Sequence, residues 1–308
     1  SLAPYRDPKS SLQWTLSRIP AAYSLVMLHS SFIAAARDRY GIRPLFYGKF
    51  GDGYVIASED SALSSIGCDD IREVEAGTIV FFSDNIPCPE IVTFSQKDSH
   101  FCSFEFVYFA RPDSNFSGIS VHELRKRLGM KLYQEHKVMG DIVIGVPDSG
   151  FSGAMGYSHA SGIVLDYGLI RNHYVGRSFI MPKDRQEIVR RKLAPMHSVI
   201  QGKEVILIDD SIVRGTTMKV IVDMVREAGA KKVYVGIHSP AVIGPCNYGL
   251  DTSRRNELIA SQNEEEELRE LIGADDLFYL STAGYKQVFE ECGVNGICTG
   301  CFDLNYPI

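Results

Sequence analysis

The spacing of apolar residues along the chain changes at about residue 118. Before that point, short apolar runs are separated by turns, a pattern typical of half-buried strands. We expect a hairpin formed by residues 22–28 and 31–37, followed by strands at 53–57 and 77–82. Residues 1–100 are therefore predicted to be rich in β-structure.

Beyond residue 118, apolar runs of strand length alternate with longer segments of helical spacing. We predict helices at 121–136, 152–160 and 186–193, an acidic solvated helix at 263–271, and strands at 141–146, 205–208 and 232–238. Met218, Ile221, Val222 and Val225 share one face of a further helix, which Gly229 ends. This order predicts an α/β domain with a doubly wound parallel sheet over residues 101–308.

Composition sets limits on this picture. A chain of 308 residues with 45% hydrophobic residues can form two domains with sizeable cores. The net charge of −6 argues against general binding of nucleic acid, and no apolar stretch is long enough to cross a membrane. Seven cysteines, an odd number, do not suggest a secreted disulfide framework and fit a cytoplasmic protein better.

The strongest chemical signal lies at residues 205–217. Four apolar residues predict a buried parallel strand, which ends in Asp209 and Asp210. The residues that follow include Ser211, Arg214, Gly215, Thr216 and Thr217. Backbone N–H groups and hydroxyls at such a turn suit one phosphate, and two carboxylates suit vicinal ribose hydroxyls or Mg²⁺. Residues 209–217, called the carboxylate loop below, could hold both ends of a ribose 5-phosphate, although an ordinary strand–turn–helix could share the pattern.

The carboxylate loop resembles the phosphoribosylpyrophosphate (PRPP) loop of type I phosphoribosyltransferases, in the form found in the glutamine PRPP amidotransferase family. The resemblance implies that Asp209 and Asp210 hold the ribose hydroxyls. It also implies that Ser211 and the turn from Arg214 to Thr217 hold the 5-phosphate. The expected fold is then a phosphoribosyltransferase domain preceded by part of a glutaminase domain.

A second loop follows the predicted strand 141–146, at the edge where ligands bind in parallel sheets. It reads Pro147, Asp148, Ser149, Gly150, which a plain turn would also use. In the family this position carries the loop on the pyrophosphate side of PRPP, so Asp148, Ser149 and Gly150 are expected to bind PRPP. Ser149 aligns with a residue that helps to hold magnesium together with the two aspartates.

Residues 171–180 resemble the flexible loop that closes over PRPP in the family, and Arg177 is the residue expected to bind there. Other basic residues of this region are Arg171, Arg185, Arg190, Arg191 and Lys192. Positive charge suits an anionic leaving group, but a solvated basic helix explains Arg190 and Arg191 equally well. Residues 104–114 extend the resemblance with a Phe-Glu…Tyr-Phe-x-Arg-Pro-Asp-Ser pattern.

Four of the cysteines form a second signal. Cys298 and Cys301 make a C-x-x-C pair, which alone fits zinc, an iron–sulfur cluster, redox chemistry or chance. With Cys102 and Cys246 they match the ligand contexts of the branch of the family that carries a 4Fe-4S cluster. The resemblance therefore implies this cluster, with structural zinc or free thiols as alternatives. Cys68, Cys88 and Cys292 lie outside the pattern.

The N-terminal part resembles the later portion of the family's N-terminal-nucleophile glutaminase domain. The matching stretches are 37–45, which reads Arg-Asp-Arg-Tyr-Gly-Ile-Arg-Pro-Leu, and 57–63. The family's nucleophilic cysteine and its Asn-Gly and Gly-Asp segments are absent, and Ser1 does not stand in that context. We therefore expect no catalytic residue for glutamine hydrolysis in this chain, and expect the first part of that domain to be missing from it.

The resemblance implies an amidophosphoribosyltransferase, which forms 5-phosphoribosylamine from PRPP and ammonia derived from glutamine in the first step of purine synthesis. It further implies Mg²⁺, feedback by purine nucleotides and a homotetramer. One alternative is a regulatory module that binds PRPP without catalysis. Another is a phosphoribosyltransferase that acts on a free base, which the glutaminase-like residues 22–63 argue against.

Overall fold

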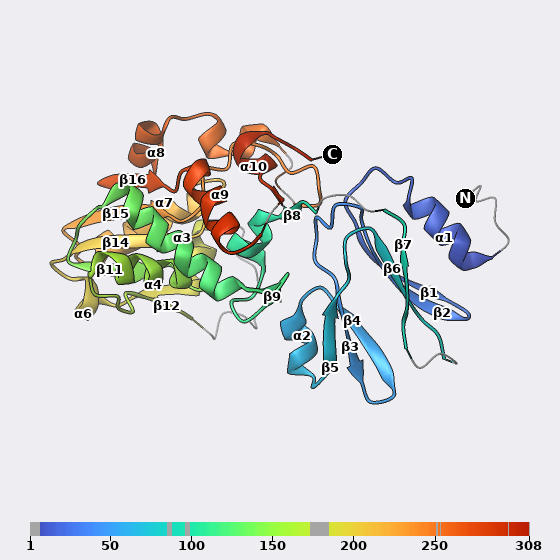
Figure 1. The fold of residues 1–308 in the computed structure, drawn as a ribbon. Coiled ribbons are helices and arrows are strands. Elements are labelled where there is room, and N and C mark those ends of the chain that lie inside the picture. Colours follow the sequence, from blue (N-terminus) through green and yellow to red (C-terminus); the bar gives the residue numbers. More distant parts are fainter. Residues whose placement is uncertain are drawn as a thin grey trace.

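The computed structural model describes residues 7–84, 88–95, 99–172, 185–250, 252, 254–294 and 296–307. Figure 1 shows a β-rich N-terminal part on one side and a mixed α/β part on the other. The elements of the N-terminal part are α1 (Pro8–Leu16), β1 (Ser24–His29), β2 (Phe32–Arg37), β3 (Phe46–Phe50), β4 (Gly53–Ala57), α2 (Asp60–Ser65), β5 (Asp69–Glu73), β6 (Thr78–Phe82) and β7 (Glu90–Thr93).

The N-terminal part contains two antiparallel sheets, ordered β1-β2-β6-β7 and β4-β3-β5. Side chains alternate between the two faces of each strand, so β6 sends Val80 toward the second sheet and Ile79 and Phe81 toward α1. Leu12 and Leu16 of α1 cover that outer face. The result is a layered sandwich with a small core on each side of the first sheet.

One face of the first sheet is only partly covered. Val26, Leu28, Ile33 and Ile91 come from β1, β2 and β7, and the strand registers place them on the face that also carries Val80. Their exposed fractions are 57%, 84%, 39% and 56%. Val26, Leu28 and Ile33 lie together beside the edge strand β1, whereas Ile91 lies on β7, across the buried Ala35 and Val80. The four residues are called the open sheet face below.

A connecting region leads to the α/β part. It contains β8 (Phe101–Cys102), a π-helix (Glu105–Phe109), β9 (Asn115–Phe116) and β10 (Ile119–Ser120). The elements that follow are α3 (Val121–His136), β11 (Ile142–Gly145), α4 (Gly150–Ser161), β12 (Leu169–Arg171), α5 (Arg185–Lys192), β13 (Leu193–Pro195), α6 (His197–Ile200), β14 (Glu204–Asp209), α7 (Thr216–Glu227), β15 (Lys232–Ile237), α8 (Glu265–Ile272), β16 (Asp276–Tyr279), α9 (Thr282–Glu291), β17 (Ile297–Cys298) and α10 (Gly300–Asp303). Two short 3-10 turns lie at Arg255–Glu257 and Ile259–Ser261.

The central sheet of this part is parallel and has the order β11-β14-β15-β16. A parallel bridge between Val143 and Leu165 extends it on the outer side of β11. The chain therefore runs outward from β11, returns across it to β14, and continues in the opposite direction. This reversal makes the gap between β11 and β14 the topological switch point of a doubly wound sheet, where ligands bind at the carboxyl ends of the strands.

Both faces of this sheet are buried. Ile206 and Ile208 of β14 pack on the side of α3, α4 and α9, whereas Val205 and Leu207 pack on the side of α7 and α8. Burial on both faces explains the uninterrupted apolar run that predicted a parallel strand. The predicted doubly wound α/β fold is confirmed.

Helices α3 and α4 meet with their backbones in contact. A Cβ atom built on Gly129 would lie 1.9 Å from the carbonyl oxygen of Gly153, and one on Gly156 would lie 1.8 Å from that of Lys126. Only glycine permits this approach. Because α4 begins at Gly150, the contact fixes the loop 147–150 against α3.

The predicted elements are found, with bounds that shift by a few residues. The 22–37 hairpin, the helix 121–136 and the strands near 141–146, 205–208 and 232–238 are all present. The prediction for residues 1–100 was incomplete, because that part also contains α1 and α2. Pro8 at the first helical position and the Asp7 cap, whose carboxylate accepts from the N–H of Ser10, start α1.

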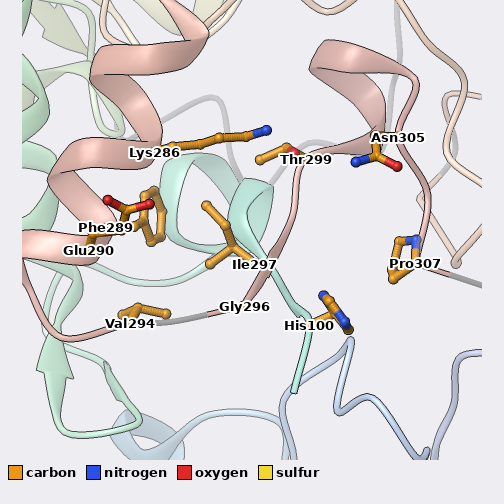
Figure 2. Close-up of a pocket in the computed structure, with 10 residues that line it drawn as sticks. All are labelled: His100, Lys286, Phe289, Glu290, Val294, Gly296, Ile297, Thr299, Asn305 and Pro307. Atoms are coloured by element: carbon orange, nitrogen blue, oxygen red, sulfur yellow. The ribbon is translucent and has the colours of Figure 1, made fainter. Parts of the chain in front are cut away.

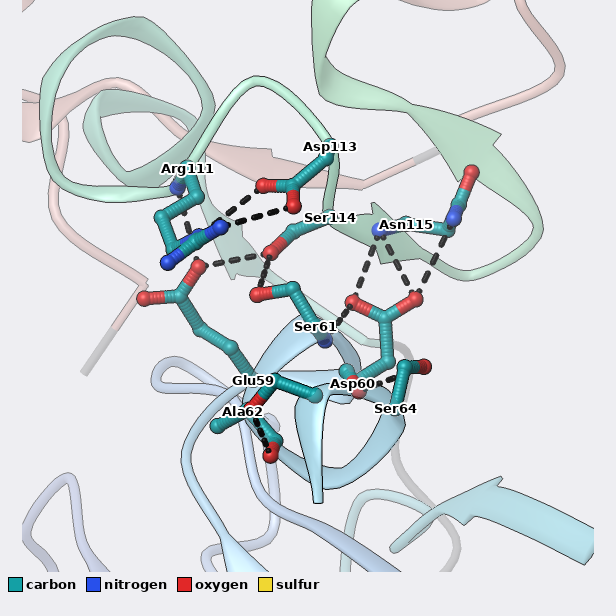
Figure 3. Close-up of polar contacts among 10 residues, drawn as sticks. Glu59, Asp60, Ser61, Ala62, Ser64, Arg111, Asp113, Ser114 and Asn115 are labelled. Atoms are coloured by element: carbon teal, nitrogen blue, oxygen red, sulfur yellow. Dashed lines mark hydrogen bonds and ion pairs between the residues drawn. The ribbon is translucent and has the colours of Figure 1, made fainter. Parts of the chain in front are cut away.

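Polar contacts join the two parts of the molecule at the start of α2 (Figure 3). The Glu59 carboxylate accepts hydrogen bonds from the backbone N–H of Arg111 at 2.9 Å and from the hydroxyl of Ser114 at 2.6 Å. Asp60 accepts from the backbone and side chain of Asn115. One continuous core also includes Phe46 and side chains of α3, so the two parts share buried surface.

Candidate functional site

The two predicted ligand loops meet at the switch point. Loop 147–150 follows β11 and the carboxylate loop follows β14, and these strands are direct neighbours. The hydroxyl of Ser149 donates a hydrogen bond to Asp210, so the loops are in contact. The structure thus brings together Asp148, Ser149 and Gly150 with the aspartate pair, as the sequence predicted.

The aspartate pair is buried. Asp209 is 8% exposed and Asp210 is 4% exposed. Burial and the adjacent Asp210 raise the pKa of Asp209 well above its usual value. Burial also raises the pKa of Asp210, against hydrogen bonds from Ser149 and Ser211 that favour its charged form. Because the two neighbouring carboxyl groups are costly to ionise, a bound cation or hydroxyl donors would stabilise their charged forms.

The loop 147–150 approaches the carboxylate loop closely. A Cβ atom on Gly150 would lie 2.5 Å from the carbonyl oxygen of Ile208 and 3.0 Å from the Cα atom of Asp209. A side chain at position 150 would therefore push the two loops apart. This requirement explains the glycine at this point of the sequence better than a plain turn does.

The remainder of the carboxylate loop leads into α7. The hydroxyl of Ser211 donates to Asp210 at 2.6 Å. Gly215, the N-cap residue of α7, has a φ of +73° and leaves the helix without a side-chain cap. The first N–H groups of α7, from Thr216 and Thr217 onward, thus lack a capping side chain, and such groups bind phosphate readily.

Basic residues near the site have partners of their own. Arg214 lies in the predicted turn, but its guanidinium donates to Glu257 at 3.1 Å. Arg171 forms an ion pair with Asp148. Arg190 pairs with Glu227 on α7 at 2.7 Å, which fits the interpretation of α5 as a solvated basic helix. Arg177 lies outside the described residues.

The donor groups at the switch point fit magnesium. Mg²⁺ prefers oxygen ligands, and in nucleotide sites it is commonly bound by one or two carboxylates together with substrate phosphates. Asp209, Asp210 and Ser149 supply such oxygens within one polar cluster. A bound cation would also favour the charged form of the two acids.

The four predicted cysteine ligands also come together. Strand β17 pairs with β8 in parallel so that Cys298 lies opposite Cys102. The carbonyl of Cys301 accepts from the N–H groups of Ile243 and Gly244, which brings the segment before Cys246 alongside. Burial raises the pKa of Cys301 well above its usual value, and the other three thiols reinforce that shift. All four sulfur atoms therefore lie near one another.

These thiols are not arranged around a single ion. In the part of the chain that the structure describes, no group of three or more His, Cys, Asp or Glu side chains has the geometry to hold one metal ion. In a cubane cluster each thiolate binds a different iron atom, so its ligands stand farther apart than those of one zinc ion. Four thiols gathered from three segments supply the ligand type and number that a 4Fe-4S cluster takes.

One cavity lies between α9 and the residues around β17 and α10. It has a volume of about 320 Å³ and is lined by Lys286, Phe289 and Glu290 of α9, by His100, and by residues near α10 (Figure 2). It contains none of the predicted ligand residues.

Among the described residues, we find no helix with the length and apolar character that a membrane span requires.

Sequence reasoning missed two buried residues beneath the aspartate pair. Arg125 of α3 is 1% exposed, and His238, directly after β15, is fully buried. Burial, helped by the charge of Arg125, lowers the pKa of His238 to about 3. The sequence predicted the helix 121–136 that carries Arg125, but nothing in it marked that residue as buried.

A parallel sheet with its switch point between β11 and β14, and a carboxylate loop that opens a helix there, define an α/β protein of the phosphoribosyltransferase type. No family model matches the chain. It is, however, 45% identical over 307 residues to the amidophosphoribosyltransferase of Bacillus subtilis, across 97% of this chain and 64% of that relative. It is 41% identical to the amidophosphoribosyltransferase of Methanocaldococcus jannaschii, across 98% of this chain and 67% of the relative.

A solved structure agrees with these relatives. The glutamine PRPP amidotransferase from B. subtilis, complexed with ADP and GMP, superposes with a TM-score of 0.90 at 44% identity, covering 98% of this chain and 68% of that one. The chain belongs to the amidophosphoribosyltransferase family. It spans 64% of the length of its B. subtilis relative.

Proposed function

We propose that this chain carries the phosphoribosyl-transfer site of an amidophosphoribosyltransferase, which makes 5-phosphoribosylamine from PRPP and ammonia. The observation that supports this most directly is the aspartate pair at the switch point, hydrogen-bonded to Ser149 of the neighbouring loop. This geometry offers a ribose site between two loops that can each hold a phosphate. The family relationship makes ammonia the acceptor.

The chain's own residues mainly bind and orient the substrate. Asp209 and Asp210 hold the ribose hydroxyls, Ser211 and the start of α7 hold the 5-phosphate, and the loop 147–150 holds the pyrophosphate. Ammonia attacks the anomeric carbon, the bond from that carbon to the pyrophosphate oxygen breaks, and pyrophosphate leaves with the electron pair. The attacking nitrogen then loses one proton to solvent. Positioning and electrostatic stabilisation provide most of the rate enhancement in such a step.

Two cofactors belong to the proposal. Mg²⁺ held by Ser149, Asp209 and Asp210 would neutralise charge on the pyrophosphate. A 4Fe-4S cluster held by Cys102, Cys246, Cys298 and Cys301 would link β8, β17 and the segment before Cys246. Because amine transfer involves no redox step, the cluster would serve the fold.

The N-terminal part belongs to a glutaminase domain that supplies ammonia in the intact protein. Its residues 37–63 contact the α/β part, but this chain has no nucleophilic cysteine in the family's context. A protein of these 308 residues should therefore use free ammonia and release no glutamate from glutamine. Purine nucleotides would regulate the enzyme, as the ADP and GMP in the B. subtilis structure suggest. We further propose that the protein is cytoplasmic and that it forms a homotetramer.

The test is the formation of 5-phosphoribosylamine and pyrophosphate from PRPP, Mg²⁺ and ammonium salt at high pH. Turnover that Asp209→Asn/Asp210→Asn abolishes supports the proposal. Tight binding of PRPP without turnover would instead support the alternative of a regulatory PRPP-binding module. Turnover with a free base in place of ammonia would instead support the other alternative, a phosphoribosyltransferase that acts on a free base.

A further inference from the structure

Arg125 is a buried cation at the centre of the molecule. It projects from α3, is 1% exposed, and is among the largest fully buried side chains. Arginine stays charged inside proteins, and a buried charge is costly unless its surroundings compensate for it. Its position therefore calls for an explanation in terms of what surrounds it.

The guanidinium group fixes the π-helix. Its Nε atom donates to the carbonyl of Phe106 at 2.6 Å, and its Nη2 atom donates to the carbonyl of Ala110 at 2.8 Å. These carbonyls lie at the two ends of the Glu105–Phe109 turn. A π-helix is rare and often marks a functional site, and here the arginine satisfies carbonyl groups at its end.

Arg125 stands between His122 and Gly129 on one face of α3. His122 is hydrogen-bonded to the Ser152 hydroxyl at 2.9 Å and Gly129 packs on Gly153, so this face of α3 contacts α4 directly after the loop 147–150.

Acids around Arg125 stabilise its charge. Burial lowers the pKa of Arg125, and Asp210 is the first of the acids that oppose this shift, followed by Glu59 and Glu105. In the described part of the chain no carboxylate lies within 4.0 Å of the guanidinium as an ion-pair partner. The positive charge of Arg125 is therefore stabilised without a direct ion pair among the described residues, and Asp210 makes the largest contribution among the acids.

His238 and Tyr108 respond to the same charges. The backbone N–H of His238 donates to the carbonyl of Asp209 at 3.1 Å, so His238 lies directly against the carboxylate loop. Its side chain is fully buried, and neither ring nitrogen has a hydrogen-bond partner among the described residues. Burial and the nearby Arg125 lower the pKa of His238, so the imidazole is neutral and adds no charge. On the π-helix, burial raises the pKa of Tyr108, and Asp210 and Asp209 add to the shift.

We propose that Arg125 is a positioning residue for PRPP, an inference that rests on the proposed function. Its two hydrogen bonds hold the π-helix against α3, and its charge compensates that of Asp210. Arg125 makes no contact with substrate in this arrangement. It acts through Asp210 and through the backbone of residues 106–110.

Two substitutions separate the charge from the hydrogen bonds. Arg125→Gln removes the charge and keeps N–H donors, whereas Arg125→Lys keeps the charge and loses the forked geometry. The matched control is Arg127→Gln on the same helix, where the side chain is 45% exposed. For each protein we would measure the dissociation constant of Mg²⁺–PRPP, the KM for PRPP and kcat with ammonia, after circular dichroism has confirmed the fold.

The expected result is a KM and dissociation constant about tenfold higher in Arg125→Gln, the size of one charge-assisted contact. Arg125→Lys should recover most of that loss, and Arg127→Gln should match the wild type. Equal defects in the Gln and Lys variants would overturn the electrostatic role and leave only a structural one. A wild type that binds Mg²⁺–PRPP without turnover would refute the proposed function but leave the binding comparison intact.

A double-mutant cycle covers the case in which Arg125→Gln fails to fold. Melting temperatures of Arg125→Gln, Asp210→Asn and the double variant are compared without ligand. If the two charges compensate each other, the double variant should be more stable than additivity predicts, and it should fold even where Arg125→Gln alone does not. Strictly additive losses would overturn the proposal.

Discussion

The carboxylate loop and the four-cysteine region are assembled in different ways. The loop is one continuous stretch between β14 and α7, and its neighbour at Ser149 follows the adjacent strand. The cysteines come from three segments that meet only because β17 pairs with β8 and because Cys301 binds the backbone of Ile243 and Gly244. The first geometry is largely local, and the second depends on the complete tertiary structure.

Because of this difference, we expect substitutions in the two regions to affect different properties: substrate binding in the carboxylate loop, and the stability of the fold in the cysteine region. A change in the carboxylate loop should alter substrate binding while the core of the sheet stays intact, because both faces of β14 are packed by other residues. A change in the cysteine region should release the C-terminal segment from β8. The predictions below test that division, beginning with the largest expected effect.

Replacing one cluster ligand should give the largest loss. Cys298→Ser is expected to yield colourless and poorly soluble protein, because thiolate ligation of a cluster contributes to the folding free energy. The wild type, purified without oxygen, should be brown and contain about four irons and four sulfides per chain. The measurements are elemental analysis, the visible absorption spectrum and the soluble yield.

Cys292 provides the control for that experiment. It lies on the last turn of α9 and is not one of the four gathered thiols. Cys292→Ser should keep the colour and the yield of the wild type. Equal effects of the two substitutions would reject the ligand assignment, and zinc in place of iron would reject the cluster.

Removing the aspartate charges should abolish turnover and spare the fold. The double variant Asp209→Asn/Asp210→Asn loses two charge-assisted contacts, each worth roughly tenfold, so the ammonia-dependent rate should fall roughly a hundredfold. Its melting temperature at pH 7 without magnesium should equal or exceed that of the wild type, because burial disfavours the charged acids. A wild-type rate in the folded variant would falsify the assignment.

Acid should destabilise the site region through His238. Its folded-state pKa of about 3 lies below the ordinary value of 6.5, so between these pH values only the unfolded chain binds the proton. The free energy of unfolding should therefore fall by about 1.4 kcal/mol for each unit that the pH drops from 6.5 toward 3, and should not change with this residue above 6.5.

Urea unfolding at pH 7, 6 and 5 measures that slope. His238→Leu should reduce the slope of the unfolding free energy against pH by the contribution of one bound proton. His159→Gln, at an exposed position of α4, should leave this slope as in the wild type. If His238→Leu unfolds with the unaltered pH slope, the buried neutral imidazole is not the cause of acid sensitivity.

A smaller effect is expected where the N-terminal part meets the connecting region. Glu59→Ala removes the acceptor for the Arg111 N–H and the Ser114 hydroxyl (Figure 3). The free energy of unfolding should fall by about 1 to 2 kcal/mol, at about 1 kcal/mol for each bond. Chemical denaturation measures this, and the KM for PRPP should change less than twofold. A large KM change would show that this contact also supports the site.

The sequence was most informative where geometry is local. The helix Val121–His136 and the buried strand before Asp209 follow from periodicity, and the α/β class follows from the alternation of strands and helices. The turn at Gly215 and the close approach at Gly150 also agree with their residue types. The helix, the strand and the turn at Gly215 are each determined by residues that are near neighbours in the chain, whereas the partners of Gly150 could be identified only in the folded structure.

Features that depend on contacts between distant parts of the chain could not be predicted from the sequence in the same way. The aromatic run Glu105–Phe109 has no helical or strand period, and its π-helix depends on Arg125 from the next helix. Arg214 belongs to the predicted turn, yet its partner Glu257 lies far along the sequence. The sequence analysis assigned no role to Arg125, and only the packed structure shows that it is buried.

The open sheet face has a practical consequence for work with this polypeptide in solution. Val26, Leu28 and Ile33 of that face present an apolar surface next to the outer edge of β1, which pairs with no further strand among the described residues. Such a surface attracts copies of itself and templates strand addition at the edge. We expect attractive protein–protein interactions, seen as a negative second virial coefficient in light scattering. Leu28→Lys should make that coefficient less negative, because it places a charge at the most exposed point of the surface.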